Sequence, residues 1–447
     1  MESAPFSSVT QFPQIQFIIQ TPTVDEWERF RGYAARVVDL HIGVPNLFSP
    51  QVNISPETMS FLEMMSTSVP LFPKLTSLRL MAATRWDVVR STLAFLSPRI
   101  TDLALTLPGE YSILLQPILS NISGRCHGVQ RLELDVTVSD SRSAHEVRGL
   151  ISAFRRTLET LVIKSPLQME YLPAIASLPQ LRVLKLEHAY FVDEIPPNSL
   201  PSLEAVCFLQ FHGIRLRQFF ERLRNPGLKK VDVSSISVIE FEDLMEVLAR
   251  FSTSLSSLST SAITDLNLPS IVVPNLFTNL RHLNVGCSSG RRHRCPFRIT
   301  DQAVANLGAA MPNLSDLTLG SAACGGFHAV TFKSLSSLST TCQGLESLSV
   351  QVDLFIMVQL CLALEGTIDT GIMSDDTQDN RCRLRKLVVG RSTLPDHADS
   401  GLVIAVGLGK IFPFLSEIVG HTGWDEVERY ITISRRALSA TRILGRQ

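Results

Sequence analysis

The chain has 447 residues, of which 45% are hydrophobic and 19% are charged. Its 41 Lys and Arg residues nearly balance its 42 Asp and Glu residues, which gives a formal net charge of −1. This balance provides no long-range field for nucleic acid or an anionic membrane, and we expect neither as a partner. The eight cysteines are scattered without a CxxC pair, which is typical of reduced, mostly buried thiols. No segment resembles a signal peptide or a membrane span, so the sequence predicts a cytoplasmic or nuclear protein.

The first predicted element is a helix that begins after Thr23. Thr23 and Glu26 have the spacing of a capping box, in which each side chain accepts a hydrogen bond from the other's backbone amide. The apolar positions on one face of this helix are Trp27, Phe30, Ala34 and Val37. An apolar helix at the end of a repeat array shields its core. Residues 1–36 are therefore predicted to form an N-terminal segment with a capping helix.

From Val37 onward one phrase, apolar-x-x-apolar-x-apolar, recurs along the chain. Successive copies are 22 residues apart at the closest, from Leu181 to Leu203, and 39 at the widest, from Leu345 to Leu384. Leucine-rich repeats have a period of roughly 20–29 residues, so the long steps indicate insertions. The copies begin at Val37, Leu75, Ile100, Val129, Leu158, Leu181, Leu203, Leu228, Leu255, Leu280, Leu314, Leu345 and Leu384, with a degraded copy at Leu415.

Each phrase predicts a short strand, because its last two apolar residues share one face of an extended chain. The intervals predict helices, as in "SAHEVRGLISAFRRT" (143–157) and "FEDLMEVLARF" (241–251). The fold class is therefore α/β, a right-handed leucine-rich-repeat solenoid (horseshoe) with a concave parallel sheet and outer helices. The solenoid is expected over residues 37–415, followed by a C-terminal capping helix within 416–447.

The heptapeptide "SLSSLST" occurs twice and tests the period directly. The copy at 254–260 falls where the repeat requires a strand, and the copy at 334–340 falls where it requires a helix. Weak local propensities allow tertiary context to decide between the two.

No catalytic, metal or cofactor motif is complete. Cys287, His293 and Cys295, with Cys324 and His328 further on, lack the spacing of a zinc site. The basic stretch 286–298 is read as a solvated insertion, with contact to a phosphate or an acidic partner as the less favoured reading. The acidic stretch 367–382 is read as a loop. The sequence therefore predicts no enzyme, no cofactor and no metal.

The concave sheet face is the predicted binding surface, because solenoids bind partners there and its strand residues carry charges of both signs. The alternative is that exposed strand faces are polar without binding anything. The candidate protein-binding residues are Arg79, Asp102, Arg131, Glu133, Lys185, Lys230, Asp232, His282, Asn284 and Asp316.

Four segments carry a resemblance to a known family: "DEWERFRGYAARVVDLHI" (25–42), "ITDQAVANLGAAMPNLSDLTLG" (299–320), "AVTFKSLSSLSTTCQGLESLSVQVD" (329–353) and "GWDEVERYI" (423–431). In this order they resemble the F-box/leucine-rich-repeat proteins of mushroom-forming (basidiomycete) fungi.

The resemblance implies the substrate-recognition half of an F-box subunit, in which the F-box binds the Skp adaptor of a cullin-type ubiquitin ligase and the repeats hold a protein substrate. Residues 1–22 lack the "LP.E.L..IF" run of an F-box, so the F-box itself is expected to be missing. The Skp adaptor and cullin are then partners only if an F-box exists upstream. The alternative is a repeat-only scaffold or inhibitor that binds a protein without ligase coupling.

Overall fold

The computed structural model describes most of the repeat array. The described residues are 23–43, 70–81, 95–107, 112–136, 141–188, 195–210, 216–224, 227–236, 238–262, 277–287, 299–320, 330–353, 382–390, 400–420 and 423–444, together with the pairs 15–16 and 53–54 and the single residues 62, 64, 392 and 394. The predicted insertions lie largely outside these ranges. The chain divides into two compact units, Met1–Ser202 and Leu203–Gln447.

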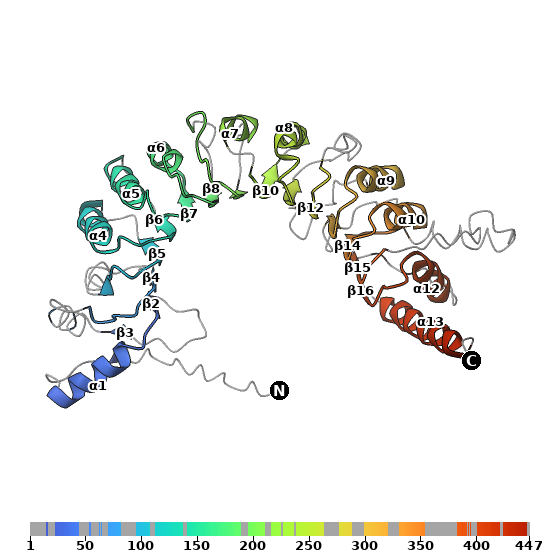
Figure 1. The fold of residues 1–447 in the computed structure, drawn as a ribbon, viewed down its shortest axis with the longest axis horizontal. Coiled ribbons are helices and arrows are strands. Elements are labelled where there is room, and N and C mark those ends of the chain that lie inside the picture. The colour runs from blue at the N-terminus through green and yellow to red at the C-terminus, as the bar shows by residue number, and fades with distance from the viewer. Residues whose placement is uncertain are drawn as a thin grey trace, which may run out of the picture. The chain divides into compact units, whose positions relative to one another are not determined.

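Unit 1 is a parallel sheet with helices packed on one side (Figure 1). Its strands pair in sequence order: β2 (Asp39–Gly43), β4 (Ser77–Met81), β5 (Asp102–Leu107), β6 (Arg131–Val136), β7 (Thr160–Pro166) and β8 (Val183–His188). Its helices are α1 (Val24–Ala34), α4 (Ser112–Arg125), α5 (Ser141–Ala153) and α6 (Leu172–Ala176), with a 3₁₀ turn at Met169–Tyr171. A separate short pair joins β1 (Ile15–Gln16) to β3 (Asn53–Ile54).

Unit 2 repeats the same arrangement. Its parallel strands are β9 (Ala205–Gln210), β10 (Lys230–Ile236), β11 (Ser257–Ala262), β12 (His282–Cys287), β13 (Asp316–Leu319), β14 (Ser347–Val350), β15 (Lys386–Gly390) and β16 (Glu417–Gly420). Its helices are α7 (Leu216–Arg222), α8 (Val238–Leu248), α9 (Asp301–Ala310), α10 (Phe332–Thr341), α12 (Ser400–Ile411) and α13 (Trp424–Leu444), with a 3₁₀ turn at Ala249–Phe251. No helix among the described residues is both long enough and apolar enough to cross a membrane.

The repeated phrase builds the core of each unit. In unit 1 the first strand leucines stand in register as Leu78, Leu103, Leu132, Leu161 and Leu184, and all five are completely buried. Burying such a side chain contributes about 1.5–3 kcal/mol, so one residue type at one position stabilises each of these five repeats.

The backbone also joins each repeat to the one before it. A single carbonyl accepts hydrogen bonds from two consecutive amides at the start of the next strand, as when Thr101 oxygen accepts from Gln130 (2.8 Å) and Arg131 (2.9 Å). The same arrangement recurs at Ser256 oxygen in unit 2. Buried backbone groups need such partners, so the strand register fixes the stacking of the repeats. These features confirm the α/β leucine-rich-repeat solenoid.

Both copies of "SLSSLST" adopt the predicted states. The first ends in β11, and the second lies within α10. Leu255 and Leu258 are buried in the strand copy, and Leu335 and Leu338 are buried in the helix copy. A three-residue spacing suits both one helix face and the phrase of the repeat, so the same leucines reach the core either way.

The two ends of the array differ in burial. The capping box between Thr23 and Glu26 is present, but α1 buries only Ala34 among its residues, while Trp27 and Phe30 stack on each other at 5.2 Å. The role of 1–36 as a cap therefore stays a prediction. At the other end, α13 buries Trp424, Val427 and Ile431 on one face, and it packs on α12 and β16. The role of 416–447 as a C-terminal cap likewise stays a prediction.

Candidate functional site

The side of the unit 1 sheet opposite its helices, here called the unit 1 face, carries side chains in rows across the strands. The first row contains Ser77, Asp102, Arg131, Thr160 and Val183, and the second contains Arg79, Ala104, Glu133, Val162 and Lys185. All the sequence-predicted residues of unit 1, Arg79, Asp102, Arg131, Glu133 and Lys185, thus fall in these two rows. Parallel strands lie about 4.8 Å apart, so neighbours within a row are within reach of each other.

Glu133 is the centre of a charge cluster on the unit 1 face. Its Oε1 lies 2.7 Å from Lys164 Nζ, and its Oε2 lies 3.7 Å from NH2 of Arg131. Arg131 Nε lies 3.7 Å from Asp102 Oδ1. Arg79 also acts on Glu133 electrostatically, reaching across the small Ala104 between them.

The pKa values of the cluster reflect this arrangement. Burial alone would raise the pKa of Glu133, but the hydrogen bond and charge of Lys164, with Arg79 and Arg131, lower it below its ordinary value. The pKa of Lys164 is raised, chiefly by its hydrogen bond to Glu133. Each group therefore stabilises the charged form of the other.

Lys164 was missed by the sequence prediction, as were Asp135 and Glu187. Each lies two residues after Glu133, Val162 or Lys185 on its own strand, and both carboxylates act electrostatically on Lys164. The signal was the period of two: a strand that continues past the second leucine points its next alternate side chain to the same face.

The corresponding unit 2 face holds the other five predicted residues. Lys230 and Asp232 share β10, and Ser257 and Ser259 follow on β11. His282 and Asn284 come next on β12, and Asp316 on β13.

The structure joins only some of these residues. His282 Nδ1 lies 2.7 Å from Asp316 Oδ2, which also accepts from Ser315 Oγ at 2.8 Å. Asn284 Nδ2 donates to Ser259 Oγ at 3.3 Å. Among the described residues, Lys230 and Asp232 form no ion pair. Charges on this face thus form separate pairs, such as His282 with Asp316 and Lys386 with Glu417, whereas those of unit 1 form one cluster.

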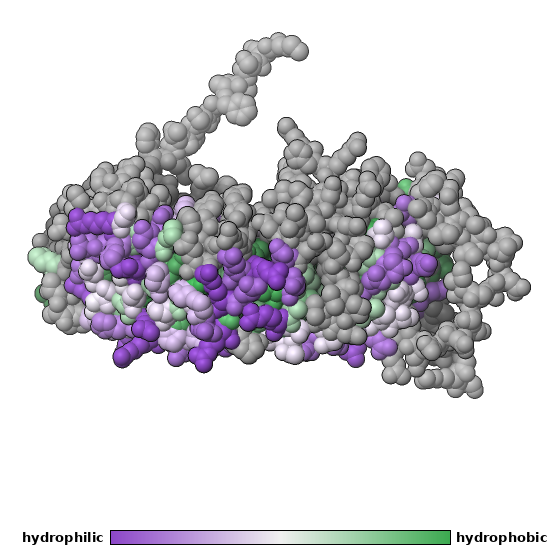
Figure 2. All heavy atoms as spheres, turned by 90° about the horizontal axis from the view of Figure 1, so that it is seen from above, coloured by the Kyte–Doolittle hydropathy of each residue, from purple (hydrophilic) through white to green (hydrophobic). Residues whose placement is uncertain are grey.

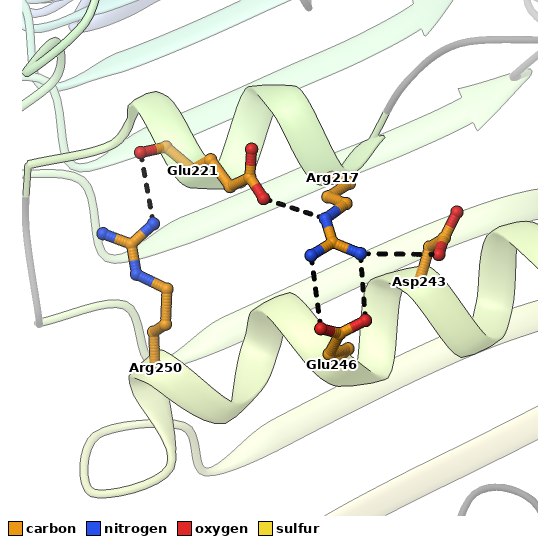
Figure 3. A network of polar contacts seen from close by, with 5 residues as sticks. All are labelled: Arg217, Glu221, Asp243, Glu246 and Arg250. Carbon is orange, nitrogen blue, oxygen red and sulfur yellow. Dashed lines mark hydrogen bonds and ion pairs between the residues drawn. The ribbon is translucent and has the colours of Figure 1, made fainter.

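The helix side carries its own polar network, which sequence analysis did not identify. Most of the described residues visible from the helix side are hydrophilic (Figure 2). In unit 2, Arg217 binds Glu246 with two hydrogen bonds of 2.9 and 3.2 Å and Glu221 with one of 2.9 Å, and Asp243 lies 3.8 Å away (Figure 3). Arg250 donates to the Glu221 carbonyl at 3.1 Å. The carboxylates of Glu221 and Glu246 are hydrogen-bonded to Arg217, so this network is an exposed brace between α7 and α8.

Metal and thiol chemistry find no support in the part of the chain that the structure describes. No group of three His, Cys, Asp or Glu side chains there could hold a metal ion. His293, Cys295, Cys324 and His328 lie outside the described residues. Cys126, Cys207, Cys342 and Cys382 are not in disulfide bonds. Burial raises the pKa of Cys126 and of Cys342 to about 11, which makes both unreactive at neutral pH.

Comparisons with known proteins add little to this description. No family model matches the chain, and no curated protein matches it. Among solved structures it is similar to an internalin (inlF) from Listeria monocytogenes, with 15% sequence identity and a TM-score of 0.37 over 71% of this chain and 82% of the internalin. The fold assignment rests instead on the register of the strands and the burial of the repeated leucines.

Proposed function

We propose that this chain is a protein-binding repeat module rather than an enzyme, and that partners bind the sheet faces. The main support is that charged side chains from consecutive repeats align in rows on the faces opposite the helices. Rows of this kind provide a long polar surface on a rigid scaffold, which gives specificity for a complementary protein surface.

We further propose that the module is the substrate-recognition half of an F-box-type ubiquitin ligase subunit acting in the cytoplasm or nucleus. The support is that three of the family-like segments coincide with repeat elements. Residues 299–320 contain α9 and β13, residues 329–353 contain α10 and β14, and the Trp of the last segment is the buried Trp424. Coupling to the Skp adaptor and cullin would require an F-box encoded upstream. Without it the chain would act as a scaffold or inhibitor that binds its partner alone.

The test is affinity purification of the tagged full chain from its native cells, with matched surface variants. Lys185→Glu with Lys230→Glu reverses two charges on the sheet faces, and neither lysine has an ion-pair partner among the described residues. Arg156→Glu with Lys333→Glu makes the same charge change on exposed positions away from the faces, one in the turn after α5 and one on α10.

The expected result is a partner that the face variant loses and the control variant retains. Recovery of Skp and cullin subunits with that partner would support the ligase proposal. Their absence, with the partner still lost only in the face variant, would leave the scaffold or inhibitor. A partner bound equally by wild type and both variants would contradict binding by the faces.

A further inference from the structure

We propose that the unit 1 face anchors an extended acidic segment of the partner, with Arg131 holding one of its carboxylates. This proposal rests on the proposed function and specifies the chemistry of the partner. Arg131 is the only exposed residue in the first two rows of β4 to β8.

Arg131 is positioned by its neighbours without being satisfied by them. Its Nε and NH2 lie 3.7 Å from Asp102 and Glu133, which is beyond hydrogen-bond distance for both atoms. Among the described residues its guanidinium donates no hydrogen bond. The two carboxylates therefore hold the group electrostatically and leave its planar fork of donors open.

The exposures of the cluster determine the sign of the charge that a partner meets. The side chain of Arg131 is 47% exposed and that of Lys164 is 39% exposed, whereas Asp102 is 30% and Glu133 only 15% exposed. Glu133 is already bonded to Lys164. The cations thus reach further into solvent than the carboxylates beneath them. A partner that approaches this part of the face first meets positive groups, so an anionic side chain fits and a basic one is repelled.

The surroundings of Arg131 favour a carboxylate on an extended chain. A guanidinium fork matches a planar carboxylate with two parallel hydrogen bonds. Beside Arg131 in the first row is Thr160, whose hydroxyl is a further donor, and the nearby Ala104 and Val162 are small or buried. Because these side chains project little from the sheet, the backbone of a partner can approach the strands closely.

Lys185 sets a second position for an acidic group. It lies two strands from Arg131, and none of the described carboxylates lies within ion-pair distance of it. The two strand spacings and the two-residue offset between the rows together make about 12 Å, which an extended segment covers in three or four residues. The partner segment is therefore expected to carry two acidic residues about three or four positions apart. Asp135 and Glu187, which act electrostatically on Lys164, place two carboxylates at that end of the face, so the partner segment is not expected to be acidic along its whole length.

The test is selection from a random peptide display library on the full-length chain, followed by affinity measurement with the selected peptides. Wild type is expected to enrich peptides with an acidic pair at this spacing. Arg131→Ala is expected to weaken their binding about tenfold or more, the ordinary effect of losing a charge-assisted bidentate contact. Arg131→Lys keeps the charge but loses the fork, so it restores only part of the affinity. Arg156→Ala, which removes the same charge elsewhere in unit 1, should change nothing.

Three results would overturn the proposal. One is enrichment of peptides without acidic residues, and another is equal binding of the acidic peptides by Arg131→Ala and Arg156→Ala. The third is no enrichment above an unrelated protein. If non-acidic peptides are selected and lost in the variant with Lys185→Glu and Lys230→Glu, binding by the sheet faces stands and only the acidic segment is refuted. If selected peptides bind all variants equally, both proposals fail.

Discussion

Trp424 holds the last helix of unit 2 in place, and its removal should release that helix. The side chain is 1% exposed, and its Nε1 donates to the Ser392 carbonyl at 2.7 Å. Ser392 in turn accepts from the Val352 amide through its Oγ at 3.0 Å. Trp424 therefore connects α13 to the preceding repeats by packing and by a hydrogen bond.

The magnitude follows from the burial. Replacing a buried Trp by Ala costs about 3–5 kcal/mol in lost transfer energy and cavity formation. Because each 1.4 kcal/mol is a factor of ten in an equilibrium, amide exchange in α13 should accelerate about a thousandfold in Trp424→Ala. Trp424→Phe keeps most of the packing but leaves the Ser392 carbonyl unpaired, which costs about 1–3 kcal/mol.

Gly420 provides a second, opposite perturbation of the same contact. A Cβ at this position would lie 2.5 Å from Cγ of Trp424 and 2.8 Å from Cγ2 of Val389. Neither neighbour is a flexible chain end, so Gly420→Ala should destabilise α13 by about 1–3 kcal/mol through overpacking. In Trp424→Ala only the Val389 contact remains, and the vacated space lets the surroundings shift away from the added methyl group, so the same substitution should then cost much less. The expected coupling energy is about 1–3 kcal/mol.

The assay is hydrogen exchange followed by mass spectrometry, which reports α13 locally and does not require the whole chain to unfold in one step. Gly409→Ala is the matched control, because a Cβ there has no neighbour within 4 Å and Ala favours a helix over Gly by about 1 kcal/mol. Equal destabilisation by Gly420→Ala with and without Trp424 would refute the packing argument.

Further predictions concern the charge clusters and the thiols. Arg217→Ala should hardly change the urea midpoint, and any loss should vanish in high salt, because its partners are exposed and screened; a large salt-independent loss would show that the brace is not a surface network. Glu133→Gln should destabilise the chain at neutral pH and cease to do so in acid. The folded pKa of Glu133 is below its ordinary value of 4.5, so its stabilisation is present above that value and is lost as the pH falls through the folded pKa; urea unfolding of both proteins across this range is the measurement, and a difference that persists in acid would contradict it. Cys126, with its pKa raised to about 11, should react with iodoacetamide about a hundredfold more slowly in the folded than in the unfolded chain, as peptide mass spectrometry would measure; equal rates would show that the thiol is not buried.

The fold could be predicted because each repeat has apolar residues at the same positions, which must all face the core. Leu132 and Leu134, like their counterparts in the other strands, must be inward for any core to form, and a one-residue slip would expose them all. Such a pattern is readable from residue type and spacing alone. The helix-side brace was not predictable, because Arg217 and Glu246 lie on different helices whose separation in space depends on the stacking of two repeats.

The sequence predicted on which face of the sheet these side chains lie, but not which of them interact. Glu133 lies between the inward Leu132 and Leu134 and Arg131 lies two residues before it, so both fall on one face. The sequence contained no sign that Lys164 reaches back to Glu133 from the next strand, or that Arg79 acts on Glu133 across Ala104. Those contacts depend on side-chain length and on which neighbours are small. Whether a charge on the face is paired or open is therefore a property of three adjacent repeats together.

The two copies of "SLSSLST" show how far this dependence on context extends. In the strand copy, Ser254 Oγ donates to the Leu228 carbonyl and Ser256 Oγ to the Lys229 carbonyl, both in the preceding repeat. In the helix copy, Ser339 Oγ donates to the Ser336 carbonyl within the same helix. Hydroxyl groups can satisfy either backbone, so the serines permit both states and the leucines bury in both. The position of each copy within the repeat decides whether it forms a strand or a helix. The same reasoning applies to the faces, because Ser257 and Ser259 line the unit 2 face only as a result of their position in the repeat. Residue identity thus sets what a side chain can bind, while its place in the period decides whether a partner can reach it.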